Sequence, residues 1–218
     1  MDNFGNTALH KYCECQFNSN IQSLKYLIDQ KFDINKKNNK GNTPFFELRY
    51  HTINKTYIST LIENGANVNI LFNEGISAIH VLCIYEKLDM MKELMKYKMY
   101  ININIPDING DTPLLTYCRI INNKSCHSKY SIFECLIENG ANLNIADKDG
   151  KTPLMVLCNG CRFMYFIEYI INCGADIYTK DNESDTALTI SQRKNHLVYL
   201  YLIENGALWK FCNYSKKN

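Results

Sequence analysis

The chain has 218 residues, of which 46% are hydrophobic and 21% are charged, and its formal net charge at pH 7 is +2. This near balance of charge gives no electrostatic reason to expect nucleic-acid binding. No run of the sequence approaches the roughly 18 consecutive apolar residues of a membrane span, and the residues after Met1 are polar rather than an apolar signal segment. We therefore expect a cytoplasmic protein that binds neither nucleic acid nor membrane.

A six-residue motif, of the form Gly-x-Thr-Pro-Leu-x or close to it, recurs along the whole chain. Its copies start at residues 5, 41, 75, 110, 150 and, in a decayed form, 184. A period near 33 residues that opens on such a motif is typical of stacked helix pairs. The sequence therefore predicts an all-α solenoid of about six helix-turn-helix repeats within a single domain of residues 1–218, each packed only on its neighbours. The repeats are predicted to start near residues 3, 39, 73, 108, 148 and 182.

The second repeat shows how the first half of a repeat is built. Gly41 lies in a turn, where glycine is free to adopt a positive φ. Thr43 is placed to cap a helix, and Pro44 takes the first helical position, where its missing N–H costs nothing. A short first helix is therefore predicted from Pro44 to Tyr50.

The second helix of this repeat is predicted from Lys55 to Asn64, where apolar residues follow the i, i+3, i+4 spacing of a helical stripe. Gly65 is expected to end it as a left-handed cap. Residues 66–69 are then expected to turn the chain outward into a β-hairpin finger. The same ending recurs at residues 136–144, 170–177 and 202–207.

Two later segments depart from this pattern. Repeat four carries extra polar residues between its helices, around residues 122–131, and these are expected to form a surface loop that includes Cys126 and His127. The final helix, Leu197 to Ile203, is apolar almost all round. Terminal repeats normally have a polar outer face, and neither end of the chain shows such a cap. Self-association through the ends, or truncation from a longer array, would explain this.

Four of the ten cysteines lie six residues after the threonine or serine of their motif: Cys13, Cys83, Cys118 and Cys158. Equivalent positions in neighbouring repeats are separated by about a repeat width, which exceeds the roughly 7 Å Cα separation that a disulfide spans. We therefore expect small buried thiols at a helix-packing position, in keeping with a reducing cytosol.

One cysteine pair, Cys158 and Cys161, has the Cys-x-x-Cys spacing of a zinc site. No second pair at metal-ligand spacing completes four ligands, and Cys158 also belongs to the set of buried thiols. Glycine-rich phosphate-binding loops and the His-Glu-x-x-His motif do not occur in the sequence. We therefore expect no catalytic residue, no metal and no cofactor.

These motifs are those of the ankyrin repeat, which the chain resembles over essentially its whole length. The Thr-Pro-Leu-His and Leu-Ile-x-x-Gly-Ala-Asn-Val-Asn motifs occur in order and at the family's period, with local departures at residues 31–33 and 98–100. The resemblance implies that His10 and His80, at the histidine position of the motif, bridge backbone groups of adjacent repeats. Because their expected role is structural, neither His10 nor His80 is a candidate catalytic residue.

A narrower resemblance is to the ankyrin proteins of poxviruses. It rests on abundant Asn, Ile, Lys and Tyr, irregular repeat lengths, and a Tyr-Cys or Leu-Cys pair that closes the first helix, as at residues 12–13 and 82–83. Many members of that family end in an F-box-like segment that recruits a cullin-type ubiquitin ligase. Only residues 208–218 follow the last Gly-Ala pair, which is too short for that segment. The chain thus resembles the ankyrin-only members, or a truncated version of a longer one.

The family resemblance places partner binding on the concave side, formed by finger tips and the exposed ends of the first helices. The positions that the scaffold leaves free flank the motif glycine and follow the cysteine position. Tyr and Arg are enriched at interface hot spots, and exposed isoleucine needs an explanation. In repeats two to four these residues would lie side by side, unless some fold back onto the loop between helices. The predicted partner-binding residues are Tyr50, His51, Ile76, Ile84, Tyr85, Asp111, Arg119 and Ile120.

The leading functional hypothesis is a non-catalytic module that binds a host protein and modulates host defence or host range, as the poxvirus resemblance implies. The alternative is a truncated relative of an ankyrin/F-box substrate receptor for a cullin-type ubiquitin ligase, which needs an adaptor-binding segment. An enzyme has no support in the sequence. A decayed gene product without a selected function is a further hypothesis.

Overall fold

The computed structural model describes residues 1–15, 20–48, 55–123, 130–160 and 163–206. Within these ranges the chain forms α-helices and short 3-10 turns, and no β-strand. None of the helices in these ranges has the length and apolar content needed to cross a bilayer. The chain divides into two compact units, Met1–Ile108 (unit 1) and Asn109–Asn218 (unit 2). The predicted single domain of residues 1–218 stays a prediction.

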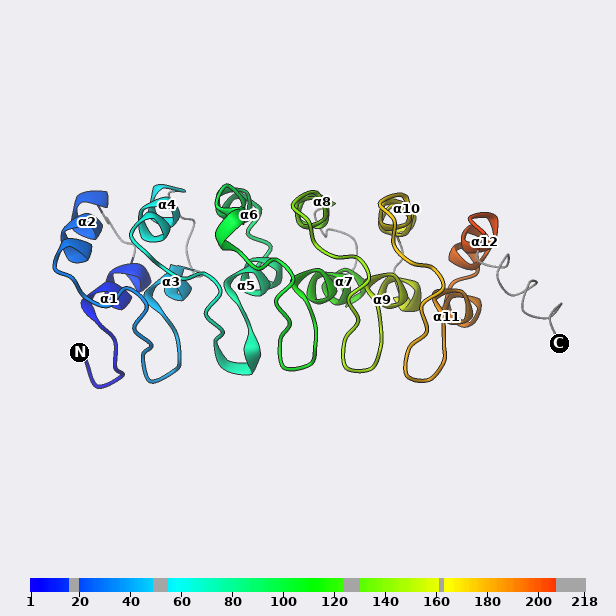
Figure 1. Ribbon diagram of the computed structural model, residues 1–218, viewed down its shortest axis with the longest axis horizontal. Coiled ribbons are helices and arrows are strands. Elements are labelled where there is room, and N and C mark those ends of the chain that lie inside the picture. Colours follow the sequence, from blue (N-terminus) through cyan, green and yellow to red (C-terminus); the bar gives the residue numbers. More distant parts are fainter. Residues whose placement is uncertain (16–19, 49–54, 124–129, 161–162, 207–218) are drawn as a thin grey trace. The chain divides into compact units, whose positions relative to one another are not determined.

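Unit 1 contains three helix pairs. Its first helices form one row, its second helices form another, and the fingers project on the side of the first helices (Figure 1). Helix α1 packs on α3, α2 packs on α4, and α4 packs on α6. The helices are α1 (Ala8–Glu14), α2 (Ile21–Asp29), α3 (Pro44–Glu47), α4 (Lys55–Glu63), α5 (Ala78–Ile84) and α6 (Leu88–Met95).

Unit 2 repeats this arrangement. Helices α7, α9 and α11 form a continuous row in which each packs on the next, and α8, α10 and α12 pack on the first helix of their own pair. The helices are α7 (Pro113–Asn123), α8 (Tyr130–Glu138), α9 (Pro153–Gly160), α10 (Met164–Asn172), α11 (Ala187–Lys194) and α12 (His196–Glu204). The predicted all-α class and helix-pair repeat are thereby confirmed.

The predicted helix bounds agree closely with the structure. Helix α3 begins at Pro44 and α4 spans Lys55–Glu63, whereas the predicted end of the first helix at Tyr50 lies outside the described residues. Gly65 has a φ of +93° and ends α4. Its N–H donates to the Ile62 carbonyl (3.0 Å) and the Ala66 N–H donates to the Leu61 carbonyl (2.9 Å), which is the Schellman pattern.

The fingers differ from the predicted β-hairpins, because the described residues contain no strand ladder. The finger tip before α9 is instead a tight turn closed by two backbone hydrogen bonds, from the Asp147 N–H to the Lys151 carbonyl (3.1 Å) and from the Gly150 N–H to the Asp147 carbonyl (3.0 Å). The tip before α3 has the same pair of bonds at Asn38 and Gly41. Neighbouring fingers are joined by single backbone hydrogen bonds, for example from the Asn182 N–H to the Asp149 carbonyl (3.0 Å).

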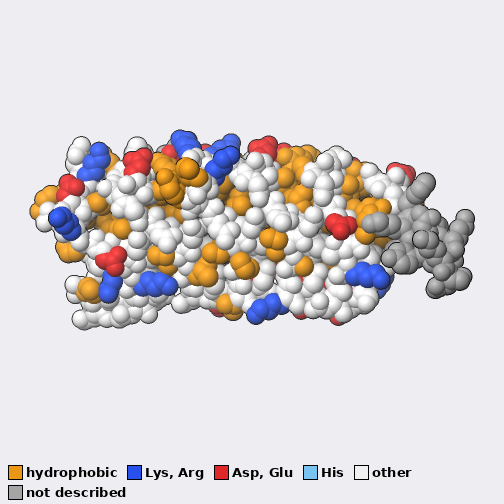
Figure 2. Space-filling view, in the orientation of Figure 1, with side chains coloured by type: hydrophobic (Ala, Val, Ile, Leu, Met, Phe, Trp, Pro, Cys, Tyr) orange, Lys and Arg blue, Asp and Glu red, His pale blue; other side chains and the backbone are white. Residues whose placement is uncertain are grey.

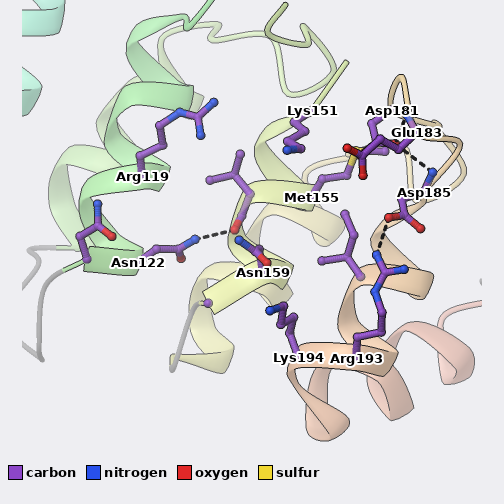
Figure 3. A pocket seen from close by; sticks show the side chains of 14 residues that line it. Arg119, Asn122, Lys151, Met155, Asn159, Asp181, Glu183, Asp185, Arg193 and Lys194 are labelled. Carbon is purple, nitrogen blue, oxygen red and sulfur yellow. Dashed lines mark hydrogen bonds and ion pairs between the residues drawn. The ribbon is translucent and has the colours of Figure 1, made fainter. Parts of the chain in front are cut away.

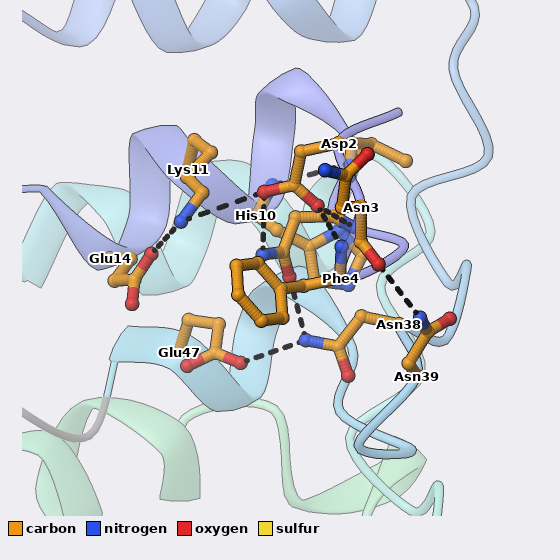
Figure 4. A network of polar contacts seen from close by, with 11 residues as sticks. Asp2, Asn3, Phe4, His10, Lys11, Glu14, Asn38, Asn39 and Glu47 are labelled. Atoms are coloured by element: carbon orange, nitrogen blue, oxygen red, sulfur yellow. Dashed lines mark hydrogen bonds and ion pairs between the residues drawn. The ribbon is translucent and has the colours of Figure 1, made fainter.

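His10, one of the residues of the polar network drawn in Figure 4, joins two repeats. The Thr7 N–H donates to His10 Nδ1 (3.1 Å), so the proton of the ring lies on Nε2. Nε2 then donates to the Asn42 carbonyl of the next finger at 2.9 Å. His10 is buried, and His80 accepts from the Ser77 N–H through Nδ1 in the same way (3.2 Å). The predicted bridging role is confirmed for His10.

A second set of contacts between repeats uses asparagines that the sequence analysis did not single out. Asn35 donates from Nδ2 to the Gly65 carbonyl (2.9 Å), and its Oδ1 accepts from the Asn67 N–H (2.8 Å). Asn69 makes the same pair of bonds one repeat later, to the Tyr100 carbonyl (2.7 Å) and from the Asn102 N–H (2.8 Å). Each of these side chains joins the turn that follows the second helix of one repeat to the corresponding turn of the next repeat.

The four motif cysteines are buried and carry free thiols, as predicted. Burial raises the pKa of the Cys13 thiol far above its usual value, and the Glu47 carboxylate adds to the shift. Cys15 and Cys173 are exposed instead. Cys126 and Cys161 lie outside the described residues.

Because the thiolate is the nucleophile, site-resolved alkylation should separate the two classes. In the native protein, iodoacetamide is expected to modify Cys15 and Cys173 at least about tenfold faster than Cys118 and Cys158. Mass spectrometry of tryptic peptides measures each rate, and in urea the rates should converge. Fast native modification of Cys158 would contradict the packing role.

Candidate functional site

In unit 1, the predicted binding residues lie at the end of a first helix and on a finger. Ile84 ends α5 and is 40% exposed, and Tyr85 follows it with 48% exposure. Ile76 follows the finger glycine and is half-buried. Both side chains are therefore partly open to solvent. Tyr50 and His51 lie outside the described residues.

In unit 2, the structure brings Asp111 and Arg119 together. Arg119 Nε donates to Asp111 Oδ2 at 2.7 Å, and Nη2 donates to Asp111 Oδ1 at 3.0 Å, which is a bidentate ion pair. Arg119 Nη2 also donates to Asp147 Oδ2 of the next finger (2.5 Å). The hydrogen bond to Asp111 is the main reason that the pKa of Arg119 is raised. Ile120 is half-buried beside it.

Asp147 has a second task that the sequence analysis missed. Its Oδ1 accepts hydrogen bonds from the N–H groups of Asp149 (2.9 Å) and Lys151 (2.8 Å), and so caps the finger turn. An Asp or Asn three residues before the start of the motif makes the same pair of bonds in other fingers, and this recurring position could have been read from the sequence. These residues are Asp2, Asn38 and Asp181.

A cleft of about 470 Å³ lies along the first helices and fingers of unit 2 (Figure 3). Its walls come from the last turns of α7, α9 and α11 and from the fingers before α9 and α11. Met155, Val156 and Ile190 give it an apolar floor. Its charged lining residues are Arg119, Lys151, Asp181, Glu183, Asp185, Arg193 and Lys194.

These charges are partly paired within the cleft. Arg193 donates from Nη2 to Asp185 Oδ2, which repeats the Arg119–Asp111 pair two repeats later. This contact is the main reason that the pKa of Asp185 is lowered. Asn122 donates from Nδ2 to the Val156 carbonyl (2.5 Å), while its Oδ1 is buried without a hydrogen-bond partner in the described residues. The cleft thus offers charged groups over an apolar floor.

The two Arg–Asp pairs should contribute unequally to stability. The Asp147 side chain is 3% exposed and Asp111 is 10% exposed, while Arg119 is 41% exposed. Arg119→Gln leaves both carboxylates without their cation, and we expect it to lower the free energy of unfolding by about 1 kcal/mol, the modest value reflecting solvent screening. Arg193→Gln is the matched control and should cost less, because its only ion-pair partner, Asp185, is more exposed. Urea unfolding measures both, and equal losses would contradict this account.

Charges of both signs are interspersed on the face drawn in Figure 2, without an extended block of one sign. In the described residues, no group of three or more His, Cys, Asp or Glu side chains is arranged to hold a metal ion. Cys158 is buried among the helix-packing thiols. The arrangement can therefore bind through shape, apolar contact and ion pairing.

Comparisons with known proteins agree with this architecture. A family model described as ankyrin repeats (3 copies) matches residues 121–213, and one described as ankyrin repeat matches residues 4–39. Among solved structures, one chain in the complex of the Bd0816 predatory endopeptidase from Bdellovibrio bacteriovorus with immunity protein Bd3460 has a TM-score of 0.69. Its identity is 22%, and the alignment covers 92% of this chain and 98% of that chain, which supports the fold.

The curated relatives are viral. The chain is 29% identical over 134 residues to the ankyrin repeat protein OPG189 of variola virus, which covers 60% of this chain and 23% of the relative. It is 31% identical over 102 residues to protein FPV031 of fowlpox virus, which covers 45% of this chain and 30% of the relative. The aligned part of the chain thus spans less than a third of the length of these relatives.

The matched family ranges cover more than half of the chain, and the observed helix pairs, caps and fingers follow the same period. Ankyrin repeats form a non-enzymatic scaffold for protein interactions, and the relatives named above are viral ankyrin repeat proteins. The chain belongs to the ankyrin-repeat family.

Proposed function

We propose that this chain is a non-catalytic binding module that holds a protein of the infected host cell in the cytoplasm, and that this binding modulates host defence or host range. The observation that carries the proposal is the cleft of unit 2. Its lining carries charges of both signs over an apolar floor. Ion pairs within the protein hold only some of those charged side chains in place. The viral relatives support a host protein as the partner.

Unit 1 offers a second contact surface of the kind that interfaces use. Ile84 and Tyr85 are adjacent and exposed at the end of α5, on the side where the first helices and fingers lie. Tyrosine provides a large contact area with few rotatable bonds and is enriched at interface hot spots. In unit 1 we include Ile76, Ile84 and Tyr85 among the proposed binding residues, and in unit 2 Asp111, Arg119 and Ile120. Tyr50 and His51, which lie outside the described residues, stay predicted binding residues.

Affinity purification from infected or transfected cells, with quantitative mass spectrometry, tests this proposal. The double variant Ile84→Ser/Tyr85→Ala should lose most of a specifically bound host protein. Tyr26→Ala is the matched control, because Tyr26 is 64% exposed on the second helix α2, away from the proposed surface. Both variants should melt within a few degrees of the parent protein, so that a loss of binding reports on contact.

Two results would overturn the proposal. One is that a host partner binds the Ile84→Ser/Tyr85→Ala variant as tightly as the parent protein but does not bind the Tyr26→Ala variant. The other is that no host protein is enriched over a matched ankyrin array in any cell type that the virus infects. A partner lost only when unit 2 is altered would restrict the binding surface to the cleft.

The length of the relatives favours a second candidate function. Because the chain aligns with only 23% of OPG189, these repeats could serve as the substrate-binding part of a longer ubiquitin-ligase receptor. Co-expression with a cullin-ligase adaptor tests it: a complex formed by this chain alone supports the receptor role, whereas none is expected for the module proposed above.

A further inference from the structure

Two equivalent aspartates of unit 2 have different surroundings. Asp147 and Asp181 each lie three residues before the motif of their repeat, and each caps a finger through Oδ1. The second oxygen of Asp147 accepts from Arg119 Nη2. The second oxygen of Asp181 accepts no hydrogen bond within the described residues, although Asp181 is only 7% exposed and lines the cleft.

The sequence explains why this position is left without a cation. Nine residues after the start of its motif, repeat four has Arg119, which reaches the next finger, whereas repeat five has Asn159. Repeat four also has Asp111 one residue after its motif start, which orients the guanidinium, whereas repeat five has Lys151. Repeat five therefore lacks both the cation and the carboxylate that would hold it.

The charges around Asp181 favour a cation from outside. Glu183 is exposed and forms no ion pair in the described part of the chain, and it stands beside Asp181 at one edge of the cleft in Figure 3. Two nearby cations already face carboxylates: Arg193 binds Asp185, and Lys151 lies 3.9 Å from Asp149. Lys194 lies beyond Arg193 in the view of Figure 3, away from Asp181. The Arg193 guanidinium also lies within electrostatic range of Asp181 and Glu183, but its hydrogen bond goes to Asp185. Two carboxylates thus share an edge of the cleft, and neither is hydrogen-bonded to a guanidinium within the described residues.

We propose that the cleft of unit 2 binds an arginine side chain of the partner protein, which contacts Asp181 Oδ2 and Glu183 as Arg119 contacts Asp147. This inference rests on the proposed function and names the chemistry of one contact. Arginine fits better than lysine because its planar fork of five N–H donors can reach two carboxylates at once.

Titration of the full chain with N-acetyl-arginine amide, followed by ¹H–¹⁵N NMR, tests the contact. The Glu183 and Asp185 amides donate to Asp181 Oδ1 and so report directly on this carboxylate. We expect saturable shifts with a Kd on the order of millimolar. The uncharged isostere N-acetyl-citrulline amide should bind at least about fivefold more weakly, because the charge-assisted hydrogen bonds are lost.

Three variants make the test specific. Asp181→Asn keeps the finger cap, as Asn38 does in repeat two, but should weaken arginine binding at least about fivefold. Asp176→Asn removes the same charge from an exposed residue of unit 2 outside the cleft lining and keeps the turn cap to the Tyr178 N–H, so it should leave the Kd unchanged. Lys151→Asp/Asn159→Arg copies the Asp111–Arg119 pair into repeat five, and it should raise Tm while abolishing the arginine-specific shifts.

Equal shifts with the arginine and citrulline amides, or unchanged binding in Asp181→Asn, would overturn the arginine site. Those outcomes are distinguishable from failure of the proposed function. A host partner that still depends on Ile84 and Tyr85 would keep the binding module and remove only this contact. Arginine-specific shifts without any host partner would keep the contact and remove the module's proposed role.

Discussion

Replacing Phe166 by alanine is expected to lower the free energy of unfolding by about 3–5 kcal/mol, measured for the transition in which unit 2 unfolds. This is the largest effect of a single substitution that we predict. Phe166 lies on α10, is 0% exposed, and is surrounded by aromatic rings. Its ring centroid is 5.0 Å from that of Tyr130 and 5.1 Å from that of Phe133, the latter in an edge-to-face arrangement. Truncation removes these contacts and leaves a cavity that rigid helices on both sides cannot close.

Urea unfolding monitored by circular dichroism measures this loss. Leu197→Ala is the matched control, because Leu197 is 72% exposed on α12 and its truncation should change stability by less than about 0.5 kcal/mol. Phe166→Leu should recover roughly half of the loss, since it keeps part of the side-chain volume. A loss below about 1 kcal/mol for Phe166→Ala would mean that α8 and α10 collapse onto each other.

The helices and the buried cysteines were predictable because each depends on positions within one repeat, whereas the histidine bridge was expected from the family resemblance. Pro44 fixes a helix start, Gly65 fixes a helix end, and Cys158 recurs at a fixed distance from its motif. Such features are set by local backbone preferences and by the helical period. They hold whatever lies in the neighbouring repeat.

The contacts between repeats were predicted less completely. Asn35 and Asn69 recur six residues after the end of a second helix and clamp successive turns, yet the abundance of asparagine in the sequence hides this position. Asp147 and Asp181 recur three residues before their motifs. Both positions are visible once the repeats are registered, so the information was present and was not used.

The candidate site was predictable only in part, for a physical reason. Its residues come from repeats whose lengths differ, and pairing depends on how far a particular side chain reaches. Arg119 stays a predicted binding residue, but it is fixed by Asp111 and Asp147, so a partner would meet an ion pair there. The cleft appears where Asn159 and Lys151 interrupt that pattern, and periodicity alone cannot show such an interruption.

Replacing Gly150 by alanine is expected to be the second largest effect, because the finger before α9 and the next finger approach closely at this residue. Gly150 has a φ of +82°, and an added Cβ would lie 2.9 Å from the backbone nitrogen of Asn182 and 2.9 Å from the Cα of Asp181. Gly140→Ala is the matched control, since Gly140 has a φ of +94° but nothing within 4 Å of such a Cβ. Both variants carry the cost of the left-handed conformation, about 1–2 kcal/mol.

Only Gly150→Ala must also displace the neighbouring finger, which we expect to add about 1–3 kcal/mol to the loss measured by urea unfolding. The displacement acts on the hydrogen bond from the Asn182 N–H to the Asp149 carbonyl and on Asp181 itself. Gly150→Ala should therefore weaken binding of N-acetyl-arginine amide, whereas Gly140→Ala should not. Equal losses of stability in the two variants would mean that the neighbouring finger can move aside without a cost in free energy. A carboxylate on such a mobile finger could not hold a guanidinium in a fixed position.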